Sequence, residues 1–325
     1  MPDPVDYEDK LVPVSAIDTG DGFCRFGLRV DADALVASIG DVGLINPPVL
    51  RERRDSNYQI VCGFRRVEAC RVLKWRETKA RVLRGDYPDL QVLKLAISDN
   101  RSHRQLNVVE QARAIERLSA CLPQKGRLEI LSSILGFPKN QKVLEKLQTL
   151  AGLPEPVQAG VLEEIVSFEA AVDLGEFSGE DALSFLGLFK QLKLSQNKQK
   201  EVVTFVAEIA IREGVEAQDV LRSKEIRKIL DYPDLNRNEK ASQIRALLKR
   251  RRFPALLDAE ERFARELKAL KLDEHIHMTG PANFEGGAVT LRMTFKDEKT
   301  FSERRKTLER IAKNPALKRL LNPFD

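Results

Sequence analysis

A glycine followed closely by two arginines is the first place in this sequence where side chains could do chemistry. Residues Tyr58 to Val61 are typical of a strand, and the segment after Gly63 predicts a helix with Arg65 and Arg66 in its first turn. Glycine lets the backbone approach an anion closely, and the unpaired N–H groups of a helix start point at it. Guanidinium groups add bidentate donors. The pattern indicates a phosphate site or, alternatively, a solvated helix surface.

A second polar cluster runs from Asp99 to Arg104, just before another expected helix. Asn107 can cap that helix, and Glu110, three residues later, can complete a capping box. Asp99 and Asn100 are hard oxygen ligands of the kind that a phosphate-bridging Mg²⁺ accepts. The cluster therefore suits a metal–phosphate site, and the alternative is a polar hinge between two helices.

Short strands and helices must position these two clusters. Turn residues and prolines separate them, and Gly43 is expected to end the first helix, with Asp31 or Asp33 as its cap. The second and third strands are expected to pair. The mixture predicts an α+β fold for the first hundred residues. The expected strands are Val12 to Ile17, Val49 to Arg51, Tyr58 to Val61 and Lys79 to Leu83, and the helices are Asp31 to Gly43, the segment after Gly63, and Asp89 to Ser98.

Length and composition limit the class of protein. A chain of 325 residues favours two or three domains. The net charge is only +5 although 32% of residues are charged, so any positive surface for nucleic acid must be local. Aromatic residues reach only 6%, which argues against a stacking platform for single strands. Four scattered cysteines are typical of reduced thiols, and no secretory signal or membrane-spanning run is visible, so we expect a soluble cytoplasmic protein.

The middle of the chain contains a helix-turn-helix pattern. Helices are expected over Arg127 to Leu135 and Lys139 to Leu150, with Gly136-Phe137-Pro138 as the turn between them. The second helix would enter the major groove, where lysine can reach phosphate or guanine and Asn or Gln can pair with adenine. The alternative is an ordinary helical hairpin. The candidate DNA-binding residues of this helix are Lys139, Asn140, Gln141, Lys142 and Lys146.

The remainder is mostly helical in pattern. Residues 180 to 248 predict a helical bundle, which either extends the DNA-binding domain or forms a dimer contact. The run Lys249, Arg250, Arg251, Arg252 could hold DNA phosphates without reading sequence, or could be a solvated helix end favoured by the helix dipole. The last fifty residues predict a small α/β unit of two strands and one or two helices, joined by a loop from Pro281 to Gly287. His275 and His277 stand at alternate positions of an expected strand. No third metal ligand accompanies them, so surface histidines are favoured over a metal site.

Three segments together resemble the ParB family of chromosome and plasmid partition proteins, and their order and spacing agree with it over residues 10 to 175. The family patterns are "GL-I-Q-P-I", "G-E-R-R" and "E-N-x-Q-R…L-N-P-x-E-E-A". The matching segments are Gly43 to Pro48, Gly63 to Arg66, and Asp99-Asn100 through Leu106-Asn107 to Glu110-Gln111-Ala112.

The resemblance implies an N-terminal domain of the ParB and sulfiredoxin type that binds CTP with Mg²⁺, and a nucleotide switch that closes a dimeric clamp on double-stranded DNA. It implies metal binding at Asp99 and Asn100. No basic N-terminal peptide is present, so a ParA-type ATPase partner is not implied. The residues implied to bind the nucleotide are Asn46, Pro47, Gly63, Arg65, Arg66, Asn100 and Arg104.

Several positions depart from the family pattern. Phe64 and Ser102 replace a glutamate and a glutamine, and the expected arginine stands one place later, as Arg104. Two alternatives are therefore kept: a nucleotide hydrolase or phosphotransferase on the sulfiredoxin-like fold, and a ParB-like transcriptional or accessory DNA-binding factor without a nucleotide. Cys62 is interpreted as a small buried hydrophobe, not a nucleophile.

We expect an α+β protein with a mixed α/β N-terminal domain, an all-helical middle containing the helix-turn-helix, and a small C-terminal α/β unit. We divide these parts into four domains. Their boundaries are 1–104 for the nucleotide-binding domain, 105–178 for the helix-turn-helix, 179–272 for the helical extension and 273–325 for the last unit, a candidate dimerisation element. We expect a homodimer associated with the nucleoid or a plasmid, because a clamp or a palindromic site needs two copies.

Overall fold

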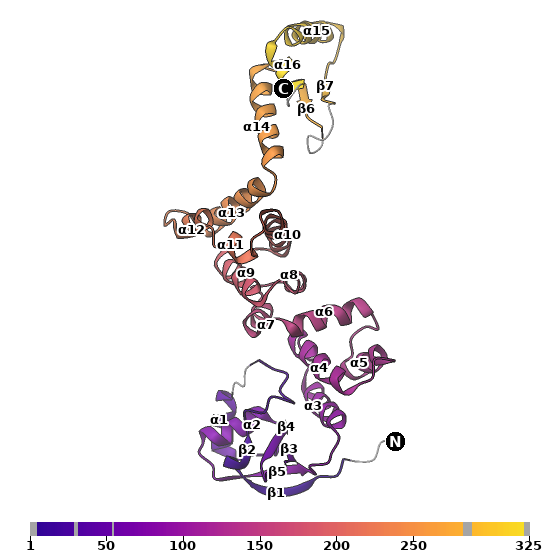
Figure 1. Cartoon of the computed structure of the whole chain (residues 1–325), viewed down its shortest axis with the longest axis vertical. Coiled ribbons are helices and arrows are strands. Elements are labelled where there is room, and N and C mark those ends of the chain that lie inside the picture. Colours follow the sequence, from indigo (N-terminus) through magenta and orange to yellow (C-terminus); the bar gives the residue numbers. More distant parts are fainter. Residues whose placement is uncertain (1–4, 29–31, 54, 282–287, 322–325) are drawn as a thin grey trace. The chain divides into compact units, whose positions relative to one another are not determined.

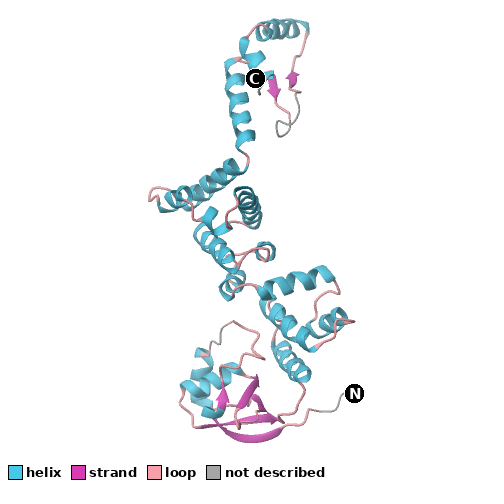
Figure 2. Cartoon of the chain, in the orientation of Figure 1, coloured by secondary structure: helices cyan, strands magenta, loops and turns pink. Residues whose placement is uncertain are grey.

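The structure is a computed structural model of the chain and describes residues 5–28, 32–53, 55–281 and 288–321. The chain divides into two compact units. Unit 1 comprises residues 1–203 and 216–222, and unit 2 comprises residues 204–215 and 223–325. The α+β class is confirmed: five strands and three helices begin unit 1, helices fill the middle, and two more strands lie near the C-terminus (Figures 1 and 2). The four expected domain boundaries stay a prediction.

A mixed five-stranded sheet forms the base of unit 1. The strand order is β1-β5-β3-β4-β2, in which β1–β5 and β3–β4 are antiparallel while β3–β5 and β2–β4 are parallel. The expected pairing of the second and third strands is confirmed, with Leu50 opposite Ile60. The strands are β1 (Glu8–Pro13), β2 (Ile17–Asp18), β3 (Val49–Glu52), β4 (Tyr58–Cys62) and β5 (Glu77–Leu83).

Three helices complete this α/β part: α1 (Asp33–Val42), α2 (Phe64–Val72) and α3 (Asp89–His103). α1 packs on α2, and α3 packs on β4. Apolar side chains of the sheet and of α2 form the core between the layers, and each is removed from water. Those buried residues are Val12, Ile17, Leu50, Ile60, Val67, Ala80 and Val82.

Two sequence predictions in this part are corrected. The expected strand from Val12 to Ile17 is instead β1, a 3₁₀ turn over Val14–Ala16 and the short β2, because the ladder stops after Pro13, which has no N–H to donate. The helix expected to end at Ser98 continues to His103, so the polar cluster belongs to the last turns of α3 and is not a hinge. No proline or glycine interrupts it, and its cations suit the helix C-terminus.

The start of α1 differs slightly from expectation. Gly43 ends the helix with φ +80°, as predicted, but the N-cap position is held by Ala32 and the helix begins at Asp33. A cap at Asp31 lies outside the described residues.

Helices form the rest of unit 1. The helix predicted over Arg127–Leu135 is confirmed as α5. The next begins at Gln141, two residues later than predicted, because Asn140 takes the N-cap position and its side chain accepts from the Lys142 N–H at 2.9 Å. The remaining elements are α4 (Val108–Cys121), α6 (Gln141–Gly152), α7 (Glu155–Leu162), α8 (Phe168–Leu174), α9 (Gly179–Leu192) and α11 (Ala217–Leu221).

Unit 2 contains the second half of α10, three helices and a small α/β end. The two predicted strands pair antiparallel as β6 and β7, and two helices, α15 and α16, follow them, in agreement with the predicted one or two. The described part of the expected loop is Pro281, and residues 282–287 lie outside the described residues. The elements are α10 (Gln196–Glu213), α12 (Lys224–Asp231), α13 (Arg237–Arg252), α14 (Pro254–Ala269), β6 (Ile276–Thr279), β7 (Thr290–Met293), α15 (Glu298–Ala312) and α16 (Pro315–Leu321).

Candidate nucleotide pocket and DNA-facing helices

A pocket of about 690 Å³ in unit 1 brings the two predicted polar clusters together. It is bordered by the end of β4 and the start of α2, by the last turns of α3, and by the segment before β3. Every residue that the sequence assigned to the nucleotide or the metal borders this one cavity, although their binding roles stay predictions. Those residues are Asn46, Pro47, Gly63, Arg65, Arg66, Asp99, Asn100 and Arg104.

Arg66 connects the three stretches that border the pocket. One guanidinium nitrogen donates to the carbonyls of Asn46 and Pro47, each at 3.0 Å. The other lies 3.8 Å from Oδ2 of Asp99. Gly63 makes room for this side chain: its φ is +93°, and a Cβ built there would lie 2.8 Å from Arg66 Nε. The glycine is therefore required both by its backbone conformation and by the close approach of Arg66.

The carboxylate of Asp99 and the amide of Asn100 contribute oxygen atoms to the pocket. The Asn100 amide nitrogen donates to the Ala96 carbonyl at 2.7 Å, which orients its side-chain oxygen as an acceptor. Burial, and then the neighbouring Asp99 carboxylate, raises the pKa of the Cys62 thiol. The buried Cys62 is therefore a protonated thiol, in agreement with its interpretation as a small buried residue.

Arg104 is held at the edge of the pocket by Glu110. Its two terminal nitrogens lie 2.6 Å from the two carboxylate oxygens of Glu110, which is buried at 5% exposure. Hydrogen bonds from Glu110 raise the pKa of Arg104. Glu110 also accepts from the Asn107 N–H at 3.0 Å, and Asn107 Oδ1 accepts from the Glu110 N–H at 2.9 Å. The predicted capping box at the start of α4 is thus confirmed.

The pocket is strongly cationic. Five arginines border it against only two carboxylates, Asp99 and Glu110. This excess of positive charge favours a polyanionic ligand, because several guanidinium groups can bind it and few carboxylates in the pocket compete for them. The arginines are Arg25, Arg65, Arg66, Arg81 and Arg104.

One wall of the pocket was missed by sequence reasoning. Residues Cys24 to Gly27, before α1, border the cavity although they belong to neither a helix nor a strand. Arg117 of α4 holds this segment by donating to the carbonyls of Phe23 at 3.0 Å and Arg25 at 2.8 Å. Its guanidinium also lies 5.4 Å from the centre of the Phe26 ring. An irregular segment has no periodicity by which it could have been found.

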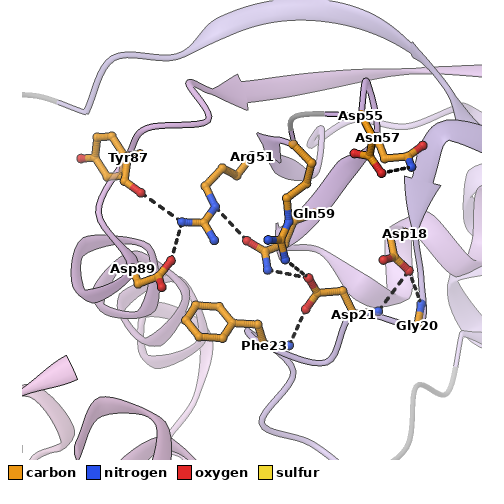
Figure 3. A network of polar contacts seen from close by, with 11 residues as sticks. Asp18, Gly20, Asp21, Phe23, Arg51, Asp55, Asn57, Gln59, Tyr87 and Asp89 are labelled. Carbon is orange, nitrogen blue, oxygen red and sulfur yellow. Dashed lines mark hydrogen bonds and ion pairs between the residues drawn. The ribbon is translucent and has the colours of Figure 1, made fainter. Parts of the chain in front are cut away.

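A polar network supports the same segment from the sheet side (Figure 3). Arg51, buried at 7% exposure, donates to Gln59 at 2.8 Å, to the Tyr87 carbonyl at 3.0 Å and to Asp89 at 2.6 Å. Gln59 in turn donates to Asp21 at 2.6 Å. The network therefore links the start of α3 and strands β3 and β4 to the segment that leads into the pocket wall.

The candidate DNA-binding residues of the second helix-turn-helix helix lie at and after its start. Lys139, Asn140, Gln141 and Lys142 are exposed, and the Gln141 amide donates to Glu145 at 3.0 Å. Lys146, by contrast, pairs with Glu169 at 2.6 Å. The first four residues are therefore exposed at the helix start, although Asn140 and Gln141 also make hydrogen bonds within the chain, and Lys146 is held in an ion pair. Their roles in DNA binding stay predictions.

The basic run at the end of α13 is largely engaged within unit 2. Arg252 forms an ion pair with Glu208 and lies 4.2 Å from the centre of the Phe253 ring. Arg251 pairs with Glu213 through two nitrogens, one of them at 3.1 Å. Arg250 lies 3.6 Å from Glu261, and Lys249 is exposed. Half of the proposed phosphate clamp therefore attaches α13 to α10, and its binding role stays a prediction.

Within the described residues, no cluster of three or more His, Cys, Asp or Glu side chains could hold a metal by itself. The helices of the described ranges include none that is both long and apolar enough to cross a membrane.

The first part of the chain is thus an α/β domain with a cationic pocket, and α5 and α6, two helices joined by a short turn, lie further along the chain. Residues 11–101 match the model of the ParB N-terminal domain. The N-terminal part of the chain therefore contains a ParB N-terminal domain.

The nucleoid occlusion protein of Bacillus licheniformis is 32% identical over 136 residues, covering 41% of this chain and 45% of that protein. The nucleoid occlusion proteins of Oceanobacillus iheyensis and of Bacillus cereus strain B4264 are 32% and 29% identical over 150 and 173 residues. They cover 45% and 52% of this chain, and 50% and 57% of the relatives. The chain thus spans about half the length of these relatives.

Comparison with solved structures also finds C-terminally truncated ParB from Caulobacter crescentus. Its complex with CTP-gamma-S is 23% identical, covers 57% of this chain and 98% of that chain, and has a TM-score of 0.27. Its complex with the centromeric parS site is 18% identical, covers 60% and 98%, and has a TM-score of 0.34. Neither likeness bears on the positions of individual residues in this chain.

Proposed function

We propose that this protein is a ParB-like DNA-binding protein whose N-terminal pocket binds CTP with Mg²⁺, and that the nucleotide switches a dimeric clamp on double-stranded DNA. One observation carries the proposal: three segments that are well separated in sequence, each carrying part of the family pattern, border a single cationic cavity. A chance pair of surface arginines would not be expected to face a carboxylate and an amide from another helix.

The residues present suit a nucleoside triphosphate and its metal. Arg65 and Arg66, at the start of α2, would neutralise phosphate oxygens beside the N–H groups that follow Gly63. Mg²⁺ is usually held by one or two carboxylates together with substrate phosphates and water. Asp99 and Asn100 fit that ligand set, and the metal when bound would supply further charge neutralisation.

The helix-turn-helix would supply the DNA contact. α5 and α6 are joined by the turn after Gly136, and the exposed residues Lys139 to Lys142 would be the part of the recognition helix that reads bases. A second copy would place a second α6 on the duplex, as a palindromic site requires. The family and the nucleoid occlusion relatives favour a role in chromosome or plasmid partition, or in a related clamp function.

Binding without efficient hydrolysis is the form of the switch that we favour. Ser102 stands where the family has a glutamine, and its hydroxyl donates to the Asp99 main-chain carbonyl at 2.7 Å. It is not among the residues that border the pocket. No residue at that position is therefore placed to orient a water molecule at a phosphate, which a hydrolase needs.

Calorimetric titration of the full chain with CTP and Mg²⁺ tests the pocket. We expect saturable binding to the wild type and a loss of at least tenfold in affinity for Arg65→Ala combined with Arg66→Ala. Arg84→Ala, which removes an exposed arginine outside the pocket, should bind as the wild type does. Absence of binding to the wild type would leave the DNA-binding factor without a nucleotide as the better description.

Retention of random DNA fragments on a filter at graded salt tests the DNA contact. Retention should fall steeply with salt, because phosphate contacts release counterions. A protein that retains no duplex even at low salt would overturn the proposed DNA-binding function.

A further inference from the structure

A cationic surface on α12 of unit 2 is not explained by the pocket or by the helix-turn-helix. Lys224, Arg227 and Lys228 stand at positions i, i+3 and i+4 of this helix, so they share one face, and all three are exposed. Ile226, 1% exposed, packs inward. We call these three cations the α12 basic face.

The cations of the α12 basic face differ in their pairing from those of the basic run at the end of α13. No ion pair in the described residues engages any of the three, whereas Arg251 and Arg252 of the basic run are both paired. Of the two carboxylates of this helix, Glu225 lies near enough to Arg251 to influence its pKa, and Asp231 stands at the helix end. Three exposed cations thus stand on α12 with one exposed carboxylate, Asp231, beside them, which leaves the face with a net positive charge. The run from Lys249 to Arg252 is the most basic in the sequence, but the α12 basic face is better placed to bind an anion because its cations are unpaired within the described residues.

The α12 basic face also borders a hollow of about 430 Å³, together with Asp231, Tyr232 and Pro233. Tyr232 is 52% exposed, so its hydroxyl is accessible as a donor. Lysine, arginine and tyrosine side chains are among the groups that hold DNA phosphates in protein–DNA complexes. Cβ atoms about 5–6 Å apart on one helix face allow the cations to contact neighbouring phosphates of one strand.

We propose that the α12 basic face binds the sugar-phosphate backbone of double-stranded DNA and adds affinity that does not depend on sequence. The proposal rests on the proposed DNA binding by α5 and α6. A duplex held there is tethered to the same chain as α12, so a few further phosphate contacts would increase the total affinity. An anionic membrane is a poorer partner, because interfacial helices bury a broad apolar face, whereas the residues of α12 outside its packed side are charged.

Fluorescence anisotropy of a labelled random duplex with the full chain tests the proposal between about 50 and 200 mM salt. Lys224→Ala, Arg227→Ala and Lys228→Ala combined should lower the slope of log affinity against log salt by about two to three, since each phosphate contact contributes about 0.9. A control variant removes three exposed lysines elsewhere in unit 2, namely Lys299, Lys306 and Lys313. It should leave the slope unchanged.

A charge-conserving variant distinguishes an effect of lost charge from an effect of a folding defect. Lys224→Arg, Arg227→Lys and Lys228→Arg combined should keep the wild-type slope, because the positive charges remain. If the alanine variant and the lysine control have equal slopes, the α12 basic face does not bind DNA, and the proposed function still stands. If the wild type itself does not bind the duplex, the proposed function fails together with this inference.

Discussion

Arg104 and Glu110 form a bidentate ion pair across the break between α3 and α4, with both N···O distances at 2.6 Å. The same carboxylate completes the capping box with Asn107. One buried side chain therefore fixes the first turn of α4 and restrains an arginine of the pocket. Because α4 also packs on α6, the pocket edge and the helix-turn-helix share a rigid element.

Replacing Glu110 should reveal this double role. Glu110→Gln removes the ion pair but keeps an acceptor for Asn107, so we expect the free energy of unfolding to fall by about 1–2 kcal/mol, discounted for the exposure of Arg104. Denaturant midpoints measure the change. Glu116→Gln, an exposed carboxylate on the same helix, should change it by less than about 0.5 kcal/mol. Equal effects of the two substitutions would contradict the structural role of Glu110.

The backbone at Gly63 gives a second prediction. Gly63→Ala places a Cβ in a left-handed conformation and 2.8 Å from Arg66 Nε, so the arginine must move away from Asn46 and Pro47. We expect a loss of about 1–2 kcal/mol in stability and at least a tenfold loss of CTP affinity. Gly187→Ala is the matched control: it lies in α9 with open space around its Cβ, and should be neutral or stabilising. If the CTP affinity of Gly63→Ala is unchanged, the position of Arg66 does not determine nucleotide binding.

Much of the first domain could be predicted from local patterns. Proline and glycine positions mark the ends of α1, β3 and β4, and the spacing of Asn107 and Glu110 identifies the start of α4. These signals work because each depends on a few adjacent residues. The pocket residues could be named because they belong to short family patterns, not because periodicity places them near one another.

Other features depend on contacts that a linear sequence does not contain. The wall from Cys24 to Gly27 is held by Arg117, more than ninety residues away in sequence. The ion pairs of Arg251 with Glu213 and of Arg252 with Glu208 join α13 to α10, and the sequence alone does not show them. α3 was expected to stop at a polar cluster, yet polarity alone does not end a helix when its side chains can face solvent.

Asn140 offers a way to separate helix capping from DNA reading. Asn140→Ser keeps a good N-cap, whereas Asn140→Ala removes it and should cost about 1 kcal/mol in stability. If the Asn140 amide pairs with a base, both variants should bind a specific duplex less tightly, by about 1–3 kcal/mol. Thermal melts and anisotropy measure the two effects. Wild-type affinity in Asn140→Ser would remove Asn140 from the base-reading residues.

Asp21 should make stability depend on pH at the acidic end. Burial alone would raise the pKa of this carboxyl, but hydrogen bonds from the Phe23 N–H, Arg53 and Gln59 lower the pKa below its ordinary 3.8. A pKa lowered by folding contributes stability above 3.8, and that stability is lost as the pH falls through the folded value. Asp21→Asn should therefore be less stable than the wild type near neutral pH, by about 1–3 kcal/mol.

The difference between Asp21→Asn and the wild type should shrink steadily as the pH is lowered below 3.8, because the wild-type carboxylate then becomes protonated. Urea unfolding at a series of pH values measures it. Asp9→Asn removes an exposed carboxylate from β1 and should change stability at neutral pH by less than about 0.5 kcal/mol. The same network supports the pocket wall, so Asp21→Asn should also weaken CTP binding while Asp9→Asn does not. A constant difference across the acidic range would show that the charge of Asp21 does not stabilise this wall.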